Sequence, residues 1–201
     1  MIKNLIFDFG GVLIDLDMEA VPRGLQMFGV QTAGSELIEL SRQYETGQIP
    51  TDRFLGEVRR RLPGSREDQI RQIWNATVAG FPTERLDYLE ALKASGKYQM
   101  FLLSNTNPLH IEQARLNMGE RDFARFRKCF QQFYLSHEIK MRKPDPEIFT
   151  FVLEENGLYA RETLFIDDTR EHTESASSLG IRTWNLQVGR ETILELPKKL
   201  S

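Results

Sequence analysis

The sequence predicts an α/β fold in which helices cover a parallel sheet and a small helical bundle is inserted after the first strand. Short apolar runs, each ending abruptly at a polar residue, are typical of buried strands. Long helical patterns separate the runs, which favours parallel strands joined by helical crossovers. The strong runs are Leu5–Phe7, Met100–Leu103 and Thr163–Ile166, and a weaker fourth is Ile181–Trp184.

The segment between the first two strands is much longer than a crossover requires. It contains helical patterns at about 19–28, 35–45, 51–62 and 66–78, separated by turn signals. Phe81-Pro82 marks the end of this insertion, and Thr83 is expected to cap the next helix. We therefore expect a discontinuous core of residues 1–15 and 85–201 and an inserted helical domain of residues 16–84.

Composition favours a globular protein of the cytoplasm. The chain has 26 basic and 29 acidic residues, and its net charge of −3 argues against a nucleic-acid or anionic-membrane partner. Cys129 is the single cysteine, which excludes an internal disulfide and fits a reducing compartment. Asp8 interrupts the N-terminal apolar run too early for a signal peptide, and no run approaches the ~18 residues of a membrane span. The sequence indicates no oligomeric state.

Carboxylates follow two of the predicted strands. Asp8 precedes Gly10 and Gly11, which have no side chain and so let a phosphate approach the backbone. Its carboxylate suits a nucleophile or a metal ligand, and the alternative is a turn cap. Asp167 and Asp168 repel each other unless a cation offsets their charge, which favours Mg²⁺ over the alternative of a helix N-cap. No metal-ligand spacing relates the three histidines, His110, His137 and His172.

A polar segment follows the second strand. Asn107 is the expected N-cap of the next helix and Pro108 its first residue. This arrangement presents hydroxyl, amide and backbone N–H donors to an anion. Capping uses Asn107, so we expect Ser104 and Asn105 to be free for a ligand.

A basic segment precedes the third strong strand. Lys143 stands before a proline, which restricts its backbone to extended conformations and fixes the direction of the residue. A lysine held in this way suits the neutralisation of a phosphate or an aspartate. Lys140 and Arg142 are nearby alternatives, and a solvated basic loop is the other interpretation.

Together these segments resemble the four motifs of the haloacid dehalogenase superfamily, in the same order. The resemblance covers the chain from Ile2 to about Trp184, and it is closest to bacterial sugar-phosphate phosphatases that include α-glucose-1-phosphate phosphatases. The four motifs are Asp8 in Phe-Asp-Phe-Gly-Gly-Val-Leu, Ser104-Asn105, Lys143-Pro144-Asp145-Pro146 and Asp167-Asp168. Details shared with the subgroup are Ser-Asn-Thr-Asn, Met-Arg-Lys-Pro and Glu45-Thr-Gly47-Gln-Ile49.

The resemblance implies a Rossmann-like core, with the inserted helices as a cap. It implies that Asp8 attacks phosphorus and forms an aspartyl phosphate. Magnesium would be held by Asp8, the Gly10 carbonyl and Asp168, with Asp167 acting directly or through water. Lys143 would neutralise Asp8 and the phosphoryl group, because two anions must meet in this reaction.

The resemblance also implies how a substrate binds. Ser104 and Asn105 would hold the phosphate oxygens, Gly11 would let the phosphate approach the backbone, and Glu45 would contact the sugar from the cap. The expected partner is therefore a small-molecule phosphate ester. The expected activity is Mg²⁺-dependent hydrolysis of small phosphorylated metabolites, with sugar phosphates favoured.

Gly10 departs from the family pattern, which has a second aspartate, a general acid and base, two residues after the nucleophile. A glycine carbonyl binds metal but transfers no proton. The candidates that could replace this aspartate are Asp15, Asp17, His137 and water. A non-catalytic or regulatory sugar-phosphate-binding protein is therefore the second interpretation. A haloacid dehalogenase is the third, and the Asp167-Asp168 pair counts against it because that reaction needs no magnesium.

Overall fold

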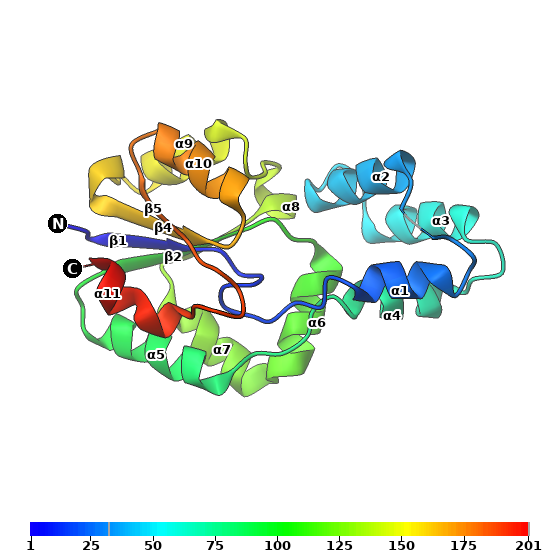
Figure 1. Cartoon of the computed structure of the whole chain (residues 1–201), viewed down its shortest axis with the longest axis horizontal. Helices are drawn as coiled ribbons and strands as arrows, with labels where there is room; N and C mark the ends of the chain where they lie inside the picture. Colours follow the sequence, from blue (N-terminus) through cyan, green and yellow to red (C-terminus); the bar gives the residue numbers. More distant parts are fainter. Residues whose placement is uncertain (32, 201) are drawn as a thin grey trace.

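The structure, a computed structural model that describes residues 1–31 and 33–200, contains a five-stranded parallel sheet flanked by helices (Figure 1). The strand order is β3-β2-β1-β4-β5, and every neighbouring pair is parallel. The four predicted strands are confirmed. The strand β3 was not predicted. The strands are β1 (Asn4–Phe7), β2 (Gln99–Ser104), β3 (Gln132–Leu135), β4 (Thr163–Asp167) and β5 (Arg182–Asn185).

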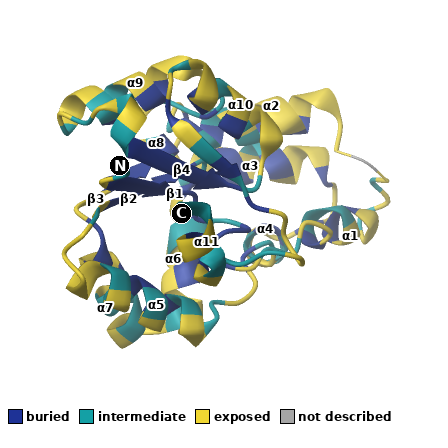
Figure 2. Ribbon diagram, turned by 60° about the vertical axis from the view of Figure 1, so that its left-hand side comes forward, coloured by how far each residue is buried: buried dark blue, intermediate teal, exposed yellow. Residues whose placement is uncertain are grey.

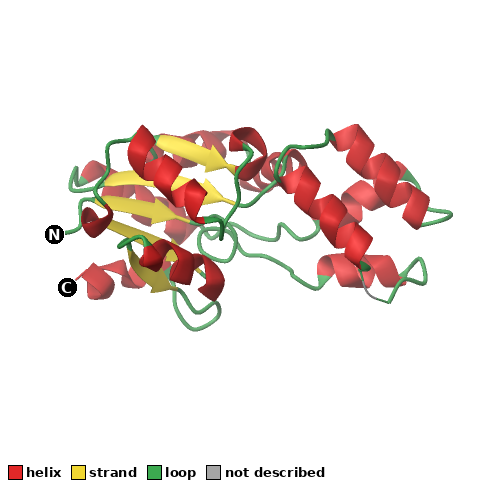
Figure 3. Cartoon of the chain, turned by 90° about the horizontal axis from the view of Figure 1, so that it is seen from above, coloured by secondary structure: helices red, strands yellow, loops and turns green. Residues whose placement is uncertain are grey.

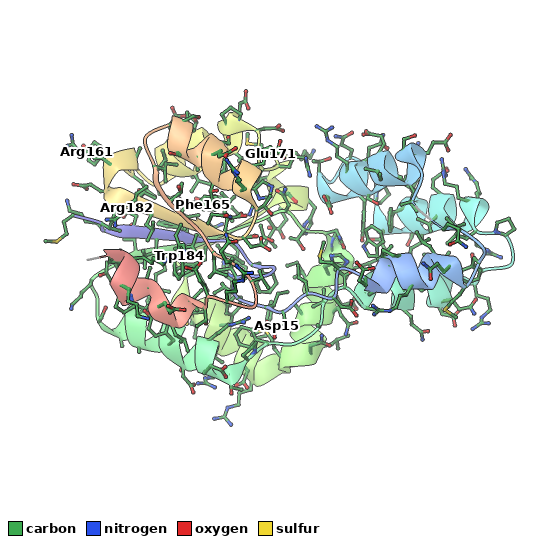
Figure 4. All side chains as sticks on the ribbon, in the orientation of Figure 1. Asp15, Arg161, Phe165, Glu171, Arg182 and Trp184 are labelled. Atoms are coloured by element: carbon green, nitrogen blue, oxygen red, sulfur yellow. The ribbon has the colours of Figure 1, made fainter. Side chains whose placement is uncertain are left out.

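Both faces of the sheet are covered, which is why its strands are apolar on both sides. Phe165 of β4 and Trp184 of β5 point to opposite faces of the sheet (Figure 4). On the Phe165 face, Phe149 packs edge-on with a ring separation of 5.1 Å. The sheet is buried while the outward sides of the helices are exposed (Figure 2). This rigid core fixes the positions of the strand ends.

The helices of the core form two layers around the sheet. The Trp184 face is covered by α5 (Thr83–Ala94), α6 (Pro108–Met118), α7 (Glu120–Cys129) and α11 (Leu196–Leu200). The other face is covered by α9 (Pro146–Glu155) and α10 (Arg170–Ser178), and the short α8 (Ser136–Ile139) follows β3. Two 3-10 turns are Ala160–Glu162 and Ile193–Glu195. No helix in the described ranges is long and apolar enough to cross a membrane.

Four helices of the long insertion form a separate group at the end of the sheet to which the strands point (Figure 3). They have their own buried cluster, in which the Tyr44 and Phe54 rings stack at 4.3 Å and Phe54 lies 4.7 Å from Trp74. Each corresponds to one of the predicted helical patterns. They are α1 (Ala20–Gln26), α2 (Ser35–Glu45), α3 (Thr51–Arg61) and α4 (Glu67–Asn75).

Two chain passages join this group to the core, and they pair with each other. Asp15 N donates to Gly80 O (2.8 Å), and Ala79 N donates to Asp15 O (3.0 Å). The passage back into the core ends at α5, whose N-cap is Pro82. The expectation that Thr83 caps this helix is therefore wrong, because Thr83 is already its first helical residue.

Candidate active site

The site lies where the carboxyl ends of β1, β2 and β4 meet. The central strand β1 has β2 on one side and β4 on the other, so the strand order reverses at β1. In open parallel sheets, ligands bind at the carboxyl ends of the strands at such a reversal. Asp8 follows β1 directly, and its N–H donates to Ile166 O of β4 (2.8 Å). Ser104 ends β2 and Asp167 ends β4, and both are buried. The sheet thus brings together three polar residues that are far apart in the sequence, as predicted.

Three carboxylates meet at this point. Each of Asp8, Asp167 and Asp168 offers an oxygen, and these oxygens lie within 4.8 Å of one another. Hard cations such as Mg²⁺ prefer such oxygen donors, so the donor set fits this ion. Gly11 has a φ of +70°, and a Cβ there would lie 2.3 Å from Asp168 Oδ2. Glycine is therefore required here for the Asp168 carboxylate to reach the site.

Asp167 and Asp168 do not cap α10. The N-cap of that helix is Thr169, and Asp167 Oδ1 accepts a hydrogen bond from Thr169 N (2.8 Å). Asp167 Oδ2 accepts another from Lys143 Nζ (2.6 Å). Protein donors thus engage both oxygens of Asp167, whereas the Thr169 hydroxyl contacts the Asp168 side chain at the longer distance of 3.4 Å. This difference favours Asp168 over Asp167 as a direct ligand of a cation.

Lys143 is the basic residue that reaches the carboxylates. Its side chain is 0% exposed, and Nζ lies 2.8 Å from Asp8 Oδ1 as well as 2.6 Å from Asp167. Asn105 fixes its backbone, because Asn105 Nδ2 donates to Lys143 O (2.8 Å) and Lys143 N donates to Asn105 Oδ1 (2.9 Å). The expectation that the Asn105 side chain is free for a ligand is therefore wrong. That amide instead positions the lysine.

Burial and charge change the protonation of these groups. Burial raises the pKa of Asp8 to about 7; Lys143 opposes this shift and Asp167 adds to it. Burial alone would raise the pKa of Asp167, but the charge of Lys143 and the hydrogen bonds from His172 and Lys143 outweigh burial and lower this pKa to about 2. For Lys143, the two carboxylates outweigh burial and raise the pKa. Burial, followed by the charge of Asp167, raises the pKa of Asp168. An added cation would favour the ionised forms of these carboxylates.

The end of α2 contacts the core beside this site. Ser136 Oγ donates to Glu45 O (2.6 Å), and the Glu45 carboxylate lies 3.9 Å from Arg142 Nη2. Burial raises the pKa of Glu45. Gly47 has a φ of +65°, and a Cβ there would lie 2.1 Å from His137 O, so only glycine allows this approach. The structure therefore places Glu45 between the inserted helices and the core.

The side chains that could replace the general acid absent at Gly10 have partners outside the carboxylate cluster. Asp15 Oδ1 pairs with Arg85 Nη1 at 2.8 Å, and Asp17 pairs with Arg23. His137 Nδ1 lies 3.2 Å from Thr106 O. None of these three belongs to the carboxylate cluster described above.

Two residues near the site were missed by sequence reasoning. Asn185 follows the weak fourth run, and its Nδ2 donates to Asp168 O (2.8 Å) and Asp167 O (3.3 Å). His172 Nδ1 lies 3.1 Å from both carboxylate oxygens of Asp167. His172 lacks the spacing of a metal ligand, but its distance of five residues from Asp167 in sequence, at the start of a helix, was a signal available for this contact.

Comparison with known proteins agrees with this geometry. The haloacid dehalogenase-like hydrolase family matches residues 2–180. A D-ribitol-5-phosphate phosphatase of Bacteroides thetaiotaomicron is 30% identical over 98% of this chain and 97% of its own length. A crystal structure of an enzyme of this family from the same organism, an aspartate-to-alanine mutant in complex with magnesium and inorganic phosphate, is 36% identical with a TM-score of 0.84, covering 95% of this chain and 96% of that one.

A second solved structure, of a predicted hydrolase of the same family from Porphyromonas gingivalis, covers 100% of this chain and 98% of its own, with 29% identity and a TM-score of 0.83. The similarity therefore includes the inserted helices as well as the sheet. Together with the family match over most of the sequence, it shows that this chain belongs to the haloacid dehalogenase-like hydrolase family.

Proposed function

We propose that this phosphoric monoester hydrolase acts on small phosphorylated metabolites, sugar phosphates above all, through a phosphorylated Asp8. The observation that carries the proposal is the buried contact between Asp8 and Lys143, 2.8 Å apart, beside two further carboxylates. A buried lysine that neutralises a carboxylate at a strand end suits a nucleophile that must approach an anion. The similarity to a D-ribitol-5-phosphate phosphatase supports a phosphorylated sugar or polyol as the substrate.

Magnesium supplies the remaining positive charge. Asp8, the Gly10 carbonyl and Asp168 would hold the ion, with Asp167 contributing through water because protein donors engage its oxygens. Bound there, Mg²⁺ would polarise a phosphoryl oxygen and offset the charge of the phosphate. A family member crystallised with magnesium and inorganic phosphate supports this use of the cluster.

The residues of the chain account for the two chemical steps. An Asp8 oxygen forms a bond to phosphorus while the bond to the sugar oxygen breaks, and the departing oxygen takes a proton from water. A second water then attacks the phosphorus, releasing inorganic phosphate and regenerating the Asp8 carboxylate. Ser104 and the backbone N–H of Asn105 would hold the phosphate oxygens, and Lys143 would neutralise the charge on Asp8 and the phosphoryl group in both steps.

We further propose that residues 16–84 act as a cap that selects the substrate. The strands point toward these helices, so a phosphate at the strand ends carries its organic group into the space beside them (Figure 3). Glu45 stands at this boundary, and its carboxylate is the acidic group that would accept hydrogen bonds from sugar hydroxyls. Closing helices over such a site would also exclude water.

One observation favours a second candidate. Gly10 stands where the family pattern has its general acid and base, and Asp15 and Asp17 are held in ion pairs with arginines. A chain of this kind could bind sugar phosphates for regulation without turning them over. The difference between the two candidates is turnover, which is directly measurable.

The test is phosphate release across a panel of sugar 1-phosphates, sugar 6-phosphates, polyol phosphates and an aryl phosphate, with Mg²⁺ and with EDTA. We expect turnover with Mg²⁺ only, and acid quenching during turnover should leave phosphate covalently attached to the Asp8 peptide in mass spectrometry. Binding of sugar phosphates by calorimetry without release of phosphate would establish the regulatory candidate instead. Halide release from a 2-haloacid in EDTA would contradict both.

A further inference from the structure

A histidine, His172, contacts the carboxylate that binds Lys143. His172 lies on the first turns of α10, and its side chain is 14% exposed. Its Nδ1 lies 3.1 Å from both Asp167 oxygens, and Asp167 Oδ2 lies 2.6 Å from Lys143 Nζ, which in turn lies 2.8 Å from Asp8. These contacts form a continuous chain of four side chains, of which Lys143 and Asp167 are 0% exposed.

The direction of the hydrogen bonds in this chain follows from its donors. Lys143 Nζ and the backbone N–H of Thr169 both donate to Asp167, so its carboxylate acts as an acceptor. An imidazole nitrogen at hydrogen-bond distance from that carboxylate must therefore carry the proton. His172 Nδ1 therefore donates its hydrogen to the Asp167 carboxylate.

The helix that carries His172 also contacts the residue that follows Lys143. Ser175 lies three residues further along α10, on the same side of the helix. Its hydroxyl donates to Pro144 O (2.5 Å), the carbonyl that follows Lys143. Through His172 and Ser175, α10 therefore contacts both the side-chain partner and the backbone neighbour of Lys143.

We propose that His172 is a positioning residue for the phosphatase reaction: its Nδ1–H orients the Asp167 carboxylate so that Oδ2 holds Lys143 against Asp8. Without this donor, the Asp167 carboxylate can rotate about its Cβ–Cγ bond, and Lys143 Nζ no longer has an acceptor at a fixed position. The lysine then spends less time beside Asp8 and the phosphoryl group, and the chemical step slows. The inference depends on the proposed function, because it concerns the same site.

The test uses two substitutions of nearly equal shape. The Nδ2 of asparagine occupies the place of a histidine Nδ1, so His172→Asn keeps a donor toward Asp167. His172→Leu has a similar outline and no donor. We expect kcat to fall about tenfold or more in His172→Leu, as for a lost hydrogen bond to a charged group, and to return to within about threefold of wild type in His172→Asn.

Two further measurements separate positioning from a structural or metal-binding role. The Mg²⁺ concentration for half-maximal activity should rise less in both variants than in Asp168→Ala, because His172 contacts Asp167, which is proposed to reach the ion only through water. Glu174→Gln, which changes only the exposed pair with Arg170 on the same helix, should leave kcat and KM unchanged. Urea unfolding of each variant gives the folded fraction by which kcat is corrected.

NMR of protein with ¹⁵N-labelled histidine tests the geometry without turnover. We expect His172, assigned by its absence from the spectrum of His172→Asn, to carry a hydrogen on Nδ1. Equal kcat in the Leu and Asn variants, or an Nδ1 without a hydrogen, would overturn the inference. If wild type releases no phosphate with Mg²⁺, the proposed function fails, and the hydrogen on Nδ1 alone then decides whether His172 donates to Asp167.

Discussion

Leu16 occupies the space that a side chain at position 10 would need. A Cβ built on Gly10 would lie 2.7 Å from Leu16 Cδ1, closer than side-chain carbons approach each other. Leu16 lies on the passage into the inserted helices and forms an antiparallel bridge with Val78 on the passage back. A side chain at position 10 would therefore require the Leu16 side chain to shift. If the proposed mechanism holds, the leaving group departs without a general acid at this position.

The first prediction concerns the leaving group. A positioned general acid contributes about 10²–10⁴ in rate, chiefly by protonating a poor leaving group. Without one, formation of the phosphoenzyme should slow steeply as the pKa of the leaving group rises in a series of aryl phosphates. The same reason predicts that sugar 1-phosphates, with their more acidic anomeric oxygen, react faster in this step than sugar 6-phosphates. Rapid-quench measurement of phosphoenzyme formation gives the slope.

A double substitution that restores a carboxylate at position 10 tests whether the absence of a general acid causes this dependence. Gly10→Asp combined with Leu16→Ala restores a carboxylate and removes the clash, so alkyl phosphates should gain about tenfold or more relative to aryl phosphates. Leu16→Ala alone is the control and should leave the slope unchanged. A flat dependence in wild type that Asp15→Asn or Asp17→Asn abolishes would show that one of these carboxylates has taken over the role.

The second prediction concerns Asp8. Asp8→Asn keeps the shape of the side chain and removes the nucleophilic charge, so turnover should fall at least about a hundredfold. Lys143 keeps Asp167 as its buried partner at 2.6 Å, so the protein should still fold, which circular dichroism and thermal unfolding check. Asp15→Asn is the matched control. Activity above about a hundredth of wild type in Asp8→Asn would exclude Asp8 as the nucleophile.

The third prediction separates the two neighbouring aspartates. Asp168→Ala should raise the Mg²⁺ concentration for half-maximal activity about tenfold or more, because this carboxylate has the freer oxygens. Asp167→Ala should weaken Mg²⁺ binding less, because its oxygens are engaged by Lys143 and Thr169 N. Calorimetry with Mg²⁺ alone measures both affinities without substrate. Equal losses of affinity would make Asp167 a direct ligand, and full activity in EDTA would contradict a metal-dependent reaction.

The fourth prediction concerns specificity. Glu45→Gln should change the ranking of sugar phosphates while sparing a small aryl phosphate, because the carboxylate lies at the boundary of the inserted helices and the core. The control is Glu39→Gln on the same helix, where the exposed carboxylate accepts a hydrogen bond from Gln43 Nε2. Measurement of kcat/KM for each substrate gives the ranking. Uniform losses on every substrate would indicate that Glu45 supports the contact between the two parts of the chain.

The sequence predicts the arrangement of the core because each strong strand combines an apolar run with a polar end. Parallel strands place those ends at one edge, so the proximity of Asp8, Ser104 and Asp167 follows from the pattern. The strand β3 could not be predicted in the same way. It is a short edge strand with an exposed first residue, Gln132, and it directly follows the aromatic residues of α7, whose helical spacing conceals where the helix ends.

The sequence predicts those site residues that stand at the ends of strands, but not the contacts between segments that complete the site. That Lys143 rather than Lys140 enters the core depends on the backbone hydrogen bonds to Asn105, which connect segments distant in sequence. The clash of position 10 with Leu16 likewise arises from how the chain folds back. Contacts of this kind depend on tertiary packing, which residue types and spacing do not encode locally.

The last prediction concerns stability at acid pH. His110 lies at the start of α6, its ring stacks on Trp74 of α4 at 5.5 Å, and its Nε2 lies 3.1 Å from Trp74 O. Burial lowers the pKa of His110 from 6.5 to about 4; the hydrogen bond to Trp74 O opposes this shift. Between these two pH values the unfolded chain therefore binds a proton that the folded protein does not.

The sign follows from this difference in proton binding. The contribution of His110 to the free energy of unfolding should be fully present above pH 6.5 and should be lost as the pH is lowered toward 4, by at most about 1.4 kcal/mol per pH unit. The raised pKa of Asp8 acts in the opposite direction over this range, and it is common to wild type and the His110 variant. His110→Gln keeps a donor near the place of Nε2 and removes the titration, so urea unfolding of this variant should lose less stability across the same window than wild type. Trp74→Leu should expose His110, which packs against Trp74 between the core and the inserted helices. The loss of stability between pH 6.5 and pH 4 should therefore also be smaller in Trp74→Leu than in wild type. Identical pH dependence in wild type and His110→Gln would show that another group carries the acid sensitivity.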